Sequence, residues 1–196
     1  MKTIGLLGGT SWPSTIEYYR ILNELAQDRM GGFHSASILL RSIDYHEIKS
    51  RYYARWDEIP ALLQQEINAL ARLGPDCIVI CNNTLHKAFD AIEVEIELAI
   101  PVFHIVKATG RAASSMNMRR LLLLGTQFTM EDGFYHRGLE QFGLQVETPD
   151  AEDRLRIQQI QSQLARGIMT EEYWRFLAAL IEKHAGSVDA VVLACT

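Results

Sequence analysis

The chain has 196 residues, of which 48% are hydrophobic and 22% charged, and its formal net charge is −5. At about 150 residues per domain, this length allows one large domain or two small ones, and the composition excludes a disordered, collagen-like or disulfide-scaffold protein. An acidic chain without a cluster of Lys and Arg is a poor nucleic-acid binder, so we expect no nucleic-acid partner.

Short apolar runs alternate with helical patterns along the chain. Apolar runs joined by helices indicate a parallel sheet covered on both faces, and so an α/β fold of the Rossmann-like or flavodoxin-like kind. The expected strands are Ile4–Leu7, Ala36–Leu40, Cys77–Cys81, Val102–Ile105, Leu121–Leu124 and Val188–Ala194. The expected helices are Ser14–Arg29, Ile59–Leu73, Thr84–Ile96, Lys107–Ser115, Glu131–Phe142, Asp153–Ala165 and Thr170–His184, with Gly143, Gly167 and Gly186 at helix C-termini.

The N-terminus and the cysteines indicate where the protein works. The run Ile4–Leu7 is too short for a signal peptide, and no stretch approaches the roughly 18 apolar residues of a membrane span. Cys77, Cys81 and Cys195 form no CxxC pair, which argues against a disulfide framework and a zinc ribbon. We therefore expect a cytoplasmic protein with reduced thiols and no membrane partner.

An internal repeat divides the chain. The segment from Asp76 to Asn83 aligns with the segment from Asp189 to Thr196, and each follows a helix and a turn of small residues. The repeat predicts two similar α/β domains, residues 1–100 and 101–196. It makes Asn82 and Cys195 equivalent positions at the C-terminal ends of strands, where open α/β sheets bind their ligands.

Cys195 is the first candidate for a catalytic residue. A thiol at a strand end faces a crevice and the start of any following helix, which lowers its pKa toward neutrality. The alternative is a small buried hydrophobic residue, which is the commoner role of an unpaired cysteine. Cys81 should point to the opposite face from its neighbour Asn82, and we interpret it as a core residue.

Small polar residues follow the expected strands in both halves. Asn82, Asn83 and Thr84 can cradle a carboxylate together with backbone N–H groups of the next helix, and plain capping is the alternative, which accounts for Thr84 but not for both asparagines. The turn Gly8-Gly9-Thr10-Ser11 has a similar design, which Gly125-Thr126 repeats, but it lacks GxGxxG and a Walker lysine.

The remaining candidates each have a plain structural alternative. Arg51 can reach a substrate carboxylate, or it lies on a solvated surface. His86 and His104 have no partner at metal-ligand spacing, so we interpret them as a first-turn helix residue and a strand-end residue. We therefore expect no metal, pyridoxal phosphate, flavin or nucleotide.

The motifs together resemble the aspartate/glutamate racemase family of cofactor-independent amino-acid racemases, over essentially the whole chain. The segments that carry the resemblance are Gly5–Trp12, Asn83–His86, Leu124–Met130 and Ala194–Thr196. The family pattern is Cys-Asn-Thr-x-His in the first half and Gly-Cys-Thr-Glu in the second.

This resemblance implies two similar domains related by a pseudo-twofold axis, with the active site between them and one catalytic thiol from each half. Racemisation needs an acid and a base on opposite faces of Cα, and two equivalent strand ends supply them. The resemblance also implies that Thr126 and Thr196, with Asn83 and Thr84, hold the carboxylates of a small amino acid such as Asp or Glu. Thr10, Ser11 and Arg51 complete the expected substrate site, and the expected assembly is a homodimer.

Two features depart from the family pattern. The first thiol position falls on Asn82, and a neutral amide is neither a useful acid nor a useful base near pH 7. The sequence also stops at Thr196, before the family's glutamate and C-terminal segment. The primary hypothesis is a racemase that uses Cys195 as acid and base; the alternatives are a one-thiol relative such as a decarboxylase, or an impaired protein that only binds an amino acid or dicarboxylate.

Overall fold

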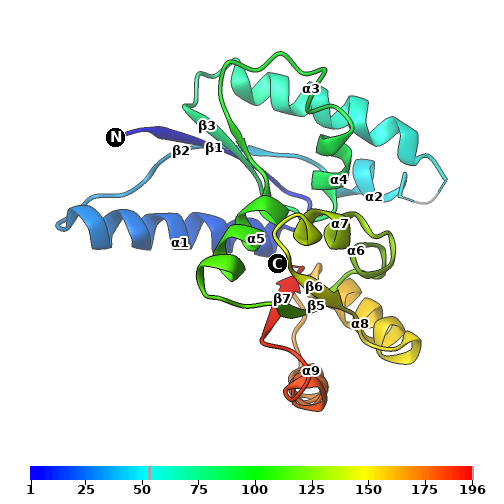
Figure 1. Ribbon diagram of the computed structural model, residues 1–196. Coiled ribbons are helices and arrows are strands. Elements are labelled where there is room, and N and C mark those ends of the chain that lie inside the picture. Colours follow the sequence, from blue (N-terminus) through cyan, green and yellow to red (C-terminus); the bar gives the residue numbers. More distant parts are fainter. Residues whose placement is uncertain (53, 196) are drawn as a thin grey trace. The chain divides into compact units, whose positions relative to one another are not determined.

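The computed structural model describes residues 1–52 and 54–195, which divide into two compact units (Figure 1). The first unit is Met1–His104 and the second begins at Ile105. Each unit is an α/β structure built on a parallel sheet, which confirms the predicted fold class.

The first unit contains a four-stranded parallel sheet in the order β2-β1-β3-β4. Helices α1 and α3 lie on opposite sides of this sheet (Figure 1). Leu6 and Leu7 of β1 are consequently both buried, as expected of a central strand covered on both faces. The elements are β1 (Thr3–Gly8), α1 (Trp12–Met30), β2 (Ser37–Ser42), α2 (Tyr45–Lys49), a 3-10 turn (Trp56–Glu58), α3 (Ile59–Ala71), β3 (Cys77–Ile80), α4 (Leu85–Asp90) and β4 (Val102–Phe103).

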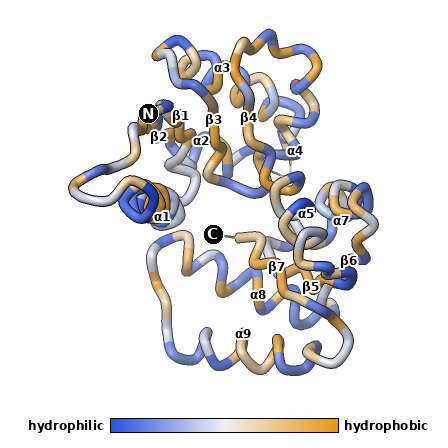
Figure 2. Tube along the Cα trace, turned by 60° about the vertical axis from the view of Figure 1, so that its left-hand side comes forward, coloured by the Kyte–Doolittle hydropathy of each residue, from blue (hydrophilic) through white to orange (hydrophobic). Residues whose placement is uncertain are grey.

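The second unit contains a three-stranded parallel sheet in the order β6-β5-β7. Its elements are α5 (Ile105–Ser115), β5 (Arg120–Gly125), α6 (Gln127–Glu131), α7 (Phe134–Glu140), β6 (Gln145–Glu147), α8 (Ala151–Leu164), α9 (Glu171–His184) and β7 (Ala190–Ala194). Hydrophobic residues run without interruption along β3 and β7, whereas the helices contain both hydrophilic and hydrophobic residues (Figure 2). None of the described helices is both long and apolar enough to span a membrane.

The expected elements differ from the observed ones at several places. The helix expected over residues 84–96 ends at Asp90 and continues as tight turns, in which Ile92 and Ile96 still face the core and so give the sequence a helical pattern. The helix expected over residues 131–142 is α7, which begins only after Gly133 at φ +83°, and the preceding α6 ends at Glu131.

Some short or polar features gave no signal that could be read from the sequence. Strand β6 was not predicted because its sequence, Gln-Val-Glu, is polar at both exposed ends, and α2 is a single short helix. Gly143 and Gly167 adopt the left-handed conformation expected after a helix, but Gly186 does not.

The internal repeat extends to the register of the strands. Leu7 of β1 lies opposite Ile80 of β3, and Leu124 of β5 lies opposite Leu193 of β7. Counting two residues beyond Ile80 and Leu193 reaches Asn82 and Cys195. The two residues therefore occupy equivalent positions, each within its own unit, as the repeat predicts.

An aspartate at the equivalent position fixes this register in each sheet. The Asp76 carboxylate accepts a hydrogen bond from the Thr3 backbone N–H at 2.6 Å, and the Asp76 N–H donates to the Thr3 carbonyl at 2.8 Å. Asp189 makes the same pair of bonds with Arg120, both at 2.8 Å. Each aspartate locks the start of its strand to the central strand beside it.

Gly9, which follows β1, is required by both its backbone and its surroundings. Its φ is +92°, and a Cβ atom at this position would overlap the carbonyl oxygen of Ile43. Ile43 is itself tied down, because its N–H donates to the Gly8 carbonyl at 2.9 Å. Gly143 makes a useful comparison, since its φ is +72° but nothing lies within 4 Å of the added atom.

We predict that Gly9→Ala lowers the free energy of unfolding far more than Gly143→Ala. The left-handed backbone alone costs an alanine about 1–2 kcal/mol, whereas the overlap at Gly9 adds roughly a further 2 kcal/mol or more. Urea unfolding followed by circular dichroism measures both variants. Equal losses of stability would show that the Ile43 backbone yields easily.

Candidate active site

Asn82 is held firmly at the C-terminal end of β3. Its side-chain oxygen Oδ1 accepts a hydrogen bond from the Leu85 N–H at 2.8 Å, which caps α4. An N–H can bond only to the amide oxygen, so this contact fixes the amide's orientation. The Nδ2 group is left as a donor with no hydrogen-bond partner in the described part of the chain.

This arrangement corrects the expected roles of the small polar residues around α4. Thr84 makes no side-chain cap bond, and the capping residue is Asn82. The first backbone N–H groups of the helix are also occupied, because His86 donates to the Asn83 carbonyl at 3.2 Å and Lys87 to the Thr84 carbonyl at 3.1 Å. Any carboxylate held here would therefore have to be bound by side chains, with Asn83 and Thr84 both buried nearby.

His86 is fully buried in the first turn of α4 and contacts the backbone of Asn82. Its Nδ1 lies 2.8 Å from the Asn82 carbonyl oxygen, and its Nε2 lies 3.4 Å from the Phe103 carbonyl oxygen. The ring of His104 packs edge-on at 4.7 Å, and His104 Nε2 lies 2.9 Å from the Asp90 carboxylate. Burial, and next the neighbouring His104, lower the pKa of His86 from 6.5 to about 4, so His86 is neutral at pH 7.

The turn after β1 brings a second group of polar atoms to its strand end. Thr10 is buried, and its hydroxyl has no hydrogen-bond partner in the described structure. An unpaired buried hydroxyl is uncommon, and a bound ligand is one way to satisfy it. The Ser11 hydroxyl, in contrast, accepts a bond from the Ser14 hydroxyl at 2.9 Å.

In the second unit, the polar groups that follow β5 are hydrogen-bonded within the unit. The Thr126 hydroxyl caps α6 by accepting from the Thr129 N–H at 3.1 Å, and the Gln127 N–H donates to Gln158 at 2.8 Å. Gln158 lies on α8 and had no signal in the sequence, because a polar residue on a helix is usually exposed. The backbone at Thr126 is thus a less open cradle than the sequence suggests.

The cysteines differ strongly in their surroundings. Cys195 directly follows β7 and is half-buried, while Thr196 lies outside the described residues. Cys81 is completely buried, as expected of a core residue, and burial raises the pKa of its thiol to about 12. Burial also raises the pKa of the half-buried Cys77.

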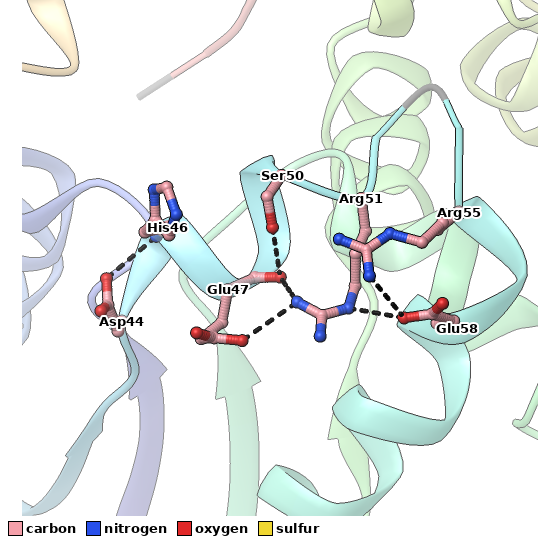
Figure 3. A network of polar contacts seen from close by, with 7 residues as sticks. All are labelled: Asp44, His46, Glu47, Ser50, Arg51, Arg55 and Glu58. Atoms are coloured by element: carbon pink, nitrogen blue, oxygen red, sulfur yellow. Dashed lines mark hydrogen bonds and ion pairs between the residues drawn. The ribbon is translucent and has the colours of Figure 1, made fainter.

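Arg51 is occupied by carboxylates of its own unit (Figure 3). Its Nε donates to Glu58 at 2.8 Å, and its Nη1 donates to the Glu47 carboxylate at 3.0 Å and to the Glu47 carbonyl. Only 17% of its side chain is exposed, so Arg51 is largely covered by its neighbours, although Glu47 itself is exposed. Its remaining nitrogen, Nη2, makes no hydrogen bond to the residues that the structure describes.

No three His, Cys, Asp or Glu side chains gather as possible metal ligands within residues 1–52 and 54–195. Four residues support the strand ends in ways that the sequence did not predict: His86 contacts the Asn82 backbone, His104 and Asp90 lie beside His86, and Gln158 accepts from the Gln127 N–H. His86 could have been recognised from its place in the Asn-Thr-x-His motif.

Comparison with known proteins identifies the family of this fold. Residues 7–196 match the family model described as Asp/Glu/Hydantoin racemase. A Yersinia pestis protein assigned as an Asp/Glu racemase is 38% identical, with a TM-score of 0.86 over 100% of this chain and 86% of its own. An aspartate racemase homologue from Pyrococcus horikoshii is 30% identical, with a TM-score of 0.82 over 100% of this chain and 85% of its own.

A third structure is similar to this chain in its fold only. The aspartate racemase of Picrophilus torridus is 20% identical, with a TM-score of 0.79 over 100% of this chain and 81% of its own. The arrangement of strands in both units is therefore retained while most of the sequence differs.

We predict that Cys195 is the thiol most sensitive to iodoacetamide and Cys81 the least. A thiol whose pKa rises from 9.0 to about 12 has roughly a thousandfold less thiolate at neutral pH, and Cys81 is also inaccessible. Peptide mapping after brief labelling gives the order, with labelling in denaturant as the control. Labelling of Cys81 as fast as that of Cys195 would contradict the observed register of β3.

We further predict that His86 makes stability depend on pH. Its folded pKa of about 4 lies below the unfolded value of 6.5, so only the unfolded chain takes up a proton between these values. The neutral His86 therefore contributes roughly 3 kcal/mol to the free energy of unfolding above pH 6.5, and this stabilisation is lost as the pH falls to 4.

The measurement is urea unfolding of the wild type and of His86→Asn across this range. The difference in their free energies of unfolding should change by about that amount, because other titrating groups are common to both proteins. Parallel pH profiles would contradict a neutral buried His86.

Proposed function

This chain belongs to the Asp/Glu/hydantoin racemase family, and we propose that it is an amino-acid racemase that needs no cofactor and uses Cys195 to exchange the Cα proton. The observation that carries the proposal is the equivalence of Asn82 and Cys195, each two residues beyond a matched strand pair. Equivalent strand ends suit a reaction that treats the two faces of Cα alike.

Cys195 is the group with the right chemistry for proton transfer. Its thiolate can take the proton from Cα, and the resulting thiol can return a proton to the same face, which gives exchange with retained configuration. Inversion needs a proton on the opposite face, and we assign its delivery to a solvent water beside Asn82. Cys195 is half-buried directly after β7, whereas Cys77 lies within β3 and Cys81 is completely buried directly after β3.

Asn82 contributes a different kind of help. Its amide oxygen is occupied by Leu85, and its Nδ2 group can only donate hydrogen bonds. When Cα loses its proton, negative charge spreads onto the substrate carboxylate, and a fixed donor stabilises that charge. Asn82 therefore supports formation of the carbanion without itself giving or taking a proton.

The proposed substrate is a small acidic amino acid, Asp or Glu. The two relatives at 38% and 30% identity bear the names of an Asp/Glu racemase and an aspartate racemase homologue. We assign substrate contacts to the unpaired Thr10 hydroxyl and to Nη2 of Arg51. Ser11, Asn83, Thr84, Thr126 and Thr196 complete the proposed binding set.

The second candidate function is binding of an amino acid or dicarboxylate without catalysis. The specific observation in its favour is Asn82, because an amide that caps a helix replaces the first thiol of the family pattern. Incubation with each enantiomer in D2O separates the two functions. Deuterium at Cα demonstrates catalysis, whereas a thermal shift without exchange demonstrates binding alone.

We predict that deuterium wash-in with retained configuration outpaces racemisation for one enantiomer. Loss of one positioned acid or base slows a step by about 10²–10⁴-fold, and here only the face served by Cys195 keeps such a group. Proton NMR measures wash-in, and chiral chromatography measures inversion.

Two substitutions and a control complete this experiment. Cys195→Ala should abolish exchange and inversion, while Cys77→Ser should leave both rates unchanged. Asn82→Cys should bring the rate of inversion closer to the rate of deuterium exchange, although it also removes a helix cap worth about 1 kcal/mol. If the wild type inverts both enantiomers at equal rates and Cys195→Ala retains its activity, the proposal is wrong.

A further inference from the structure

His86 and Leu85 together hold Asn82 at two separate points. The Leu85 N–H binds the side-chain oxygen of Asn82 at 2.8 Å, and His86 Nδ1 lies 2.8 Å from its main-chain oxygen. Both groups belong to the first turn of α4, so one rigid element fixes the side chain and the backbone of Asn82 together. Sequence analysis treated His86 as an ordinary helix residue.

The contacts of His86 determine which nitrogen carries its proton. Both ring nitrogens face backbone carbonyl oxygens, which can only accept hydrogen bonds, and a neutral imidazole has a single N–H. Nδ1 is 2.8 Å from the Asn82 oxygen, whereas Nε2 is 3.4 Å from the Phe103 oxygen. The shorter contact takes the proton, and the neutral state that burial imposes leaves Nε2 without one.

This hydrogen bond sets the plane of the peptide that joins Asn82 to Asn83. In a trans peptide the carbonyl and the next N–H point in opposite directions, so a carbonyl held by His86 fixes the direction of both. Without the donor, the Asn82 carbonyl would be left unsatisfied beside a buried ring. The backbone could then turn, and the Asn82 amide would turn with it.

We propose that His86 is a positioning residue for the reaction, whose Nδ1–H holds the Asn82 backbone so that the Nδ2 group of Asn82 stays aimed as a donor to the substrate. This inference rests on the proposed function for its kinetic consequence, although the hydrogen bond itself does not. His104 supports the ring of His86 from the side and is in turn held by Asp90 at 2.9 Å.

The first test is independent of activity. Long-range ¹H–¹⁵N NMR of the histidine-labelled protein distinguishes the two neutral tautomers and the cation. We expect His86 to be protonated on Nδ1 at pH 7 and to stay neutral to about pH 5. Protonation on Nε2, or a cation at pH 7, would overturn the proposal.

The second test uses two substitutions that differ only in where they place an amide donor. In His86→Asn the amide nitrogen lies the same number of bonds from Cα as Nδ1, whereas in His86→Gln it lies near the position of Nε2. We expect His86→Asn to keep kcat for Cα exchange within about threefold and His86→Gln to lower it by about 10- to 100-fold, since small misplacements of a reacting group have such effects.

Stability separates positioning from a merely structural role. If His86 only filled the core, kcat would follow the Tm of each variant, and equal kcat values in the two variants would likewise overturn the proposal. If the wild type shows no exchange at all, the proposed function fails but this inference remains testable. The NMR signals of the Asn82 side-chain amide and the Leu85 N–H should then move in His86→Gln and stay in place in His86→Asn, and no difference between the variants would refute it.

Discussion

The register between the central strands is the constraint on which the candidate site depends. Side chains alternate between the two faces of a strand, so a slip of one residue would exchange the environments of Cys81 and Asn82. The protein prevents this slip in the same way in both sheets, with Asp76 bonded to Thr3 and Asp189 to Arg120 at the start of the strands. Cys81 is consequently buried with a raised pKa, while Asn82 meets the first turn of α4.

Asn82 then illustrates how one side chain can satisfy a structural and a chemical requirement. An asparagine is well suited to cap a helix, because its oxygen replaces the missing backbone acceptor. The same bond leaves the amide nitrogen as the only group that can interact with a ligand. A cysteine at this position could transfer protons but would cap the helix poorly. Under the proposed function, the change from the family pattern therefore replaces proton transfer by a fixed hydrogen-bond donor.

A polar cluster of His86, His104 and Asp90 lies next to this strand end. His86 is completely buried, and only one of its two ring nitrogens can donate a hydrogen bond while the ring is neutral. Carbonyl groups of Asn82 and Phe103 face the two nitrogens, and His104 with Asp90 closes the side of the ring. The cluster therefore links the loop after β3 to the end of β4 and makes the first unit rigid where Asn82 is presented.

Periodicity and repetition in the sequence were sufficient to predict the α/β fold, the central strands and the equivalence of Asn82 with Cys195, because apolar strands and strand-end residues follow from local patterns. The burial of Cys81 also followed from simple alternation. Three features depended on the tertiary structure. Asn82 rather than Thr84 caps α4, Glu47 and Glu58 occupy Arg51, and His86 bonds the Asn82 backbone. Each is a choice among several nearby polar partners, and only the folded backbone brings one of them within hydrogen-bond distance.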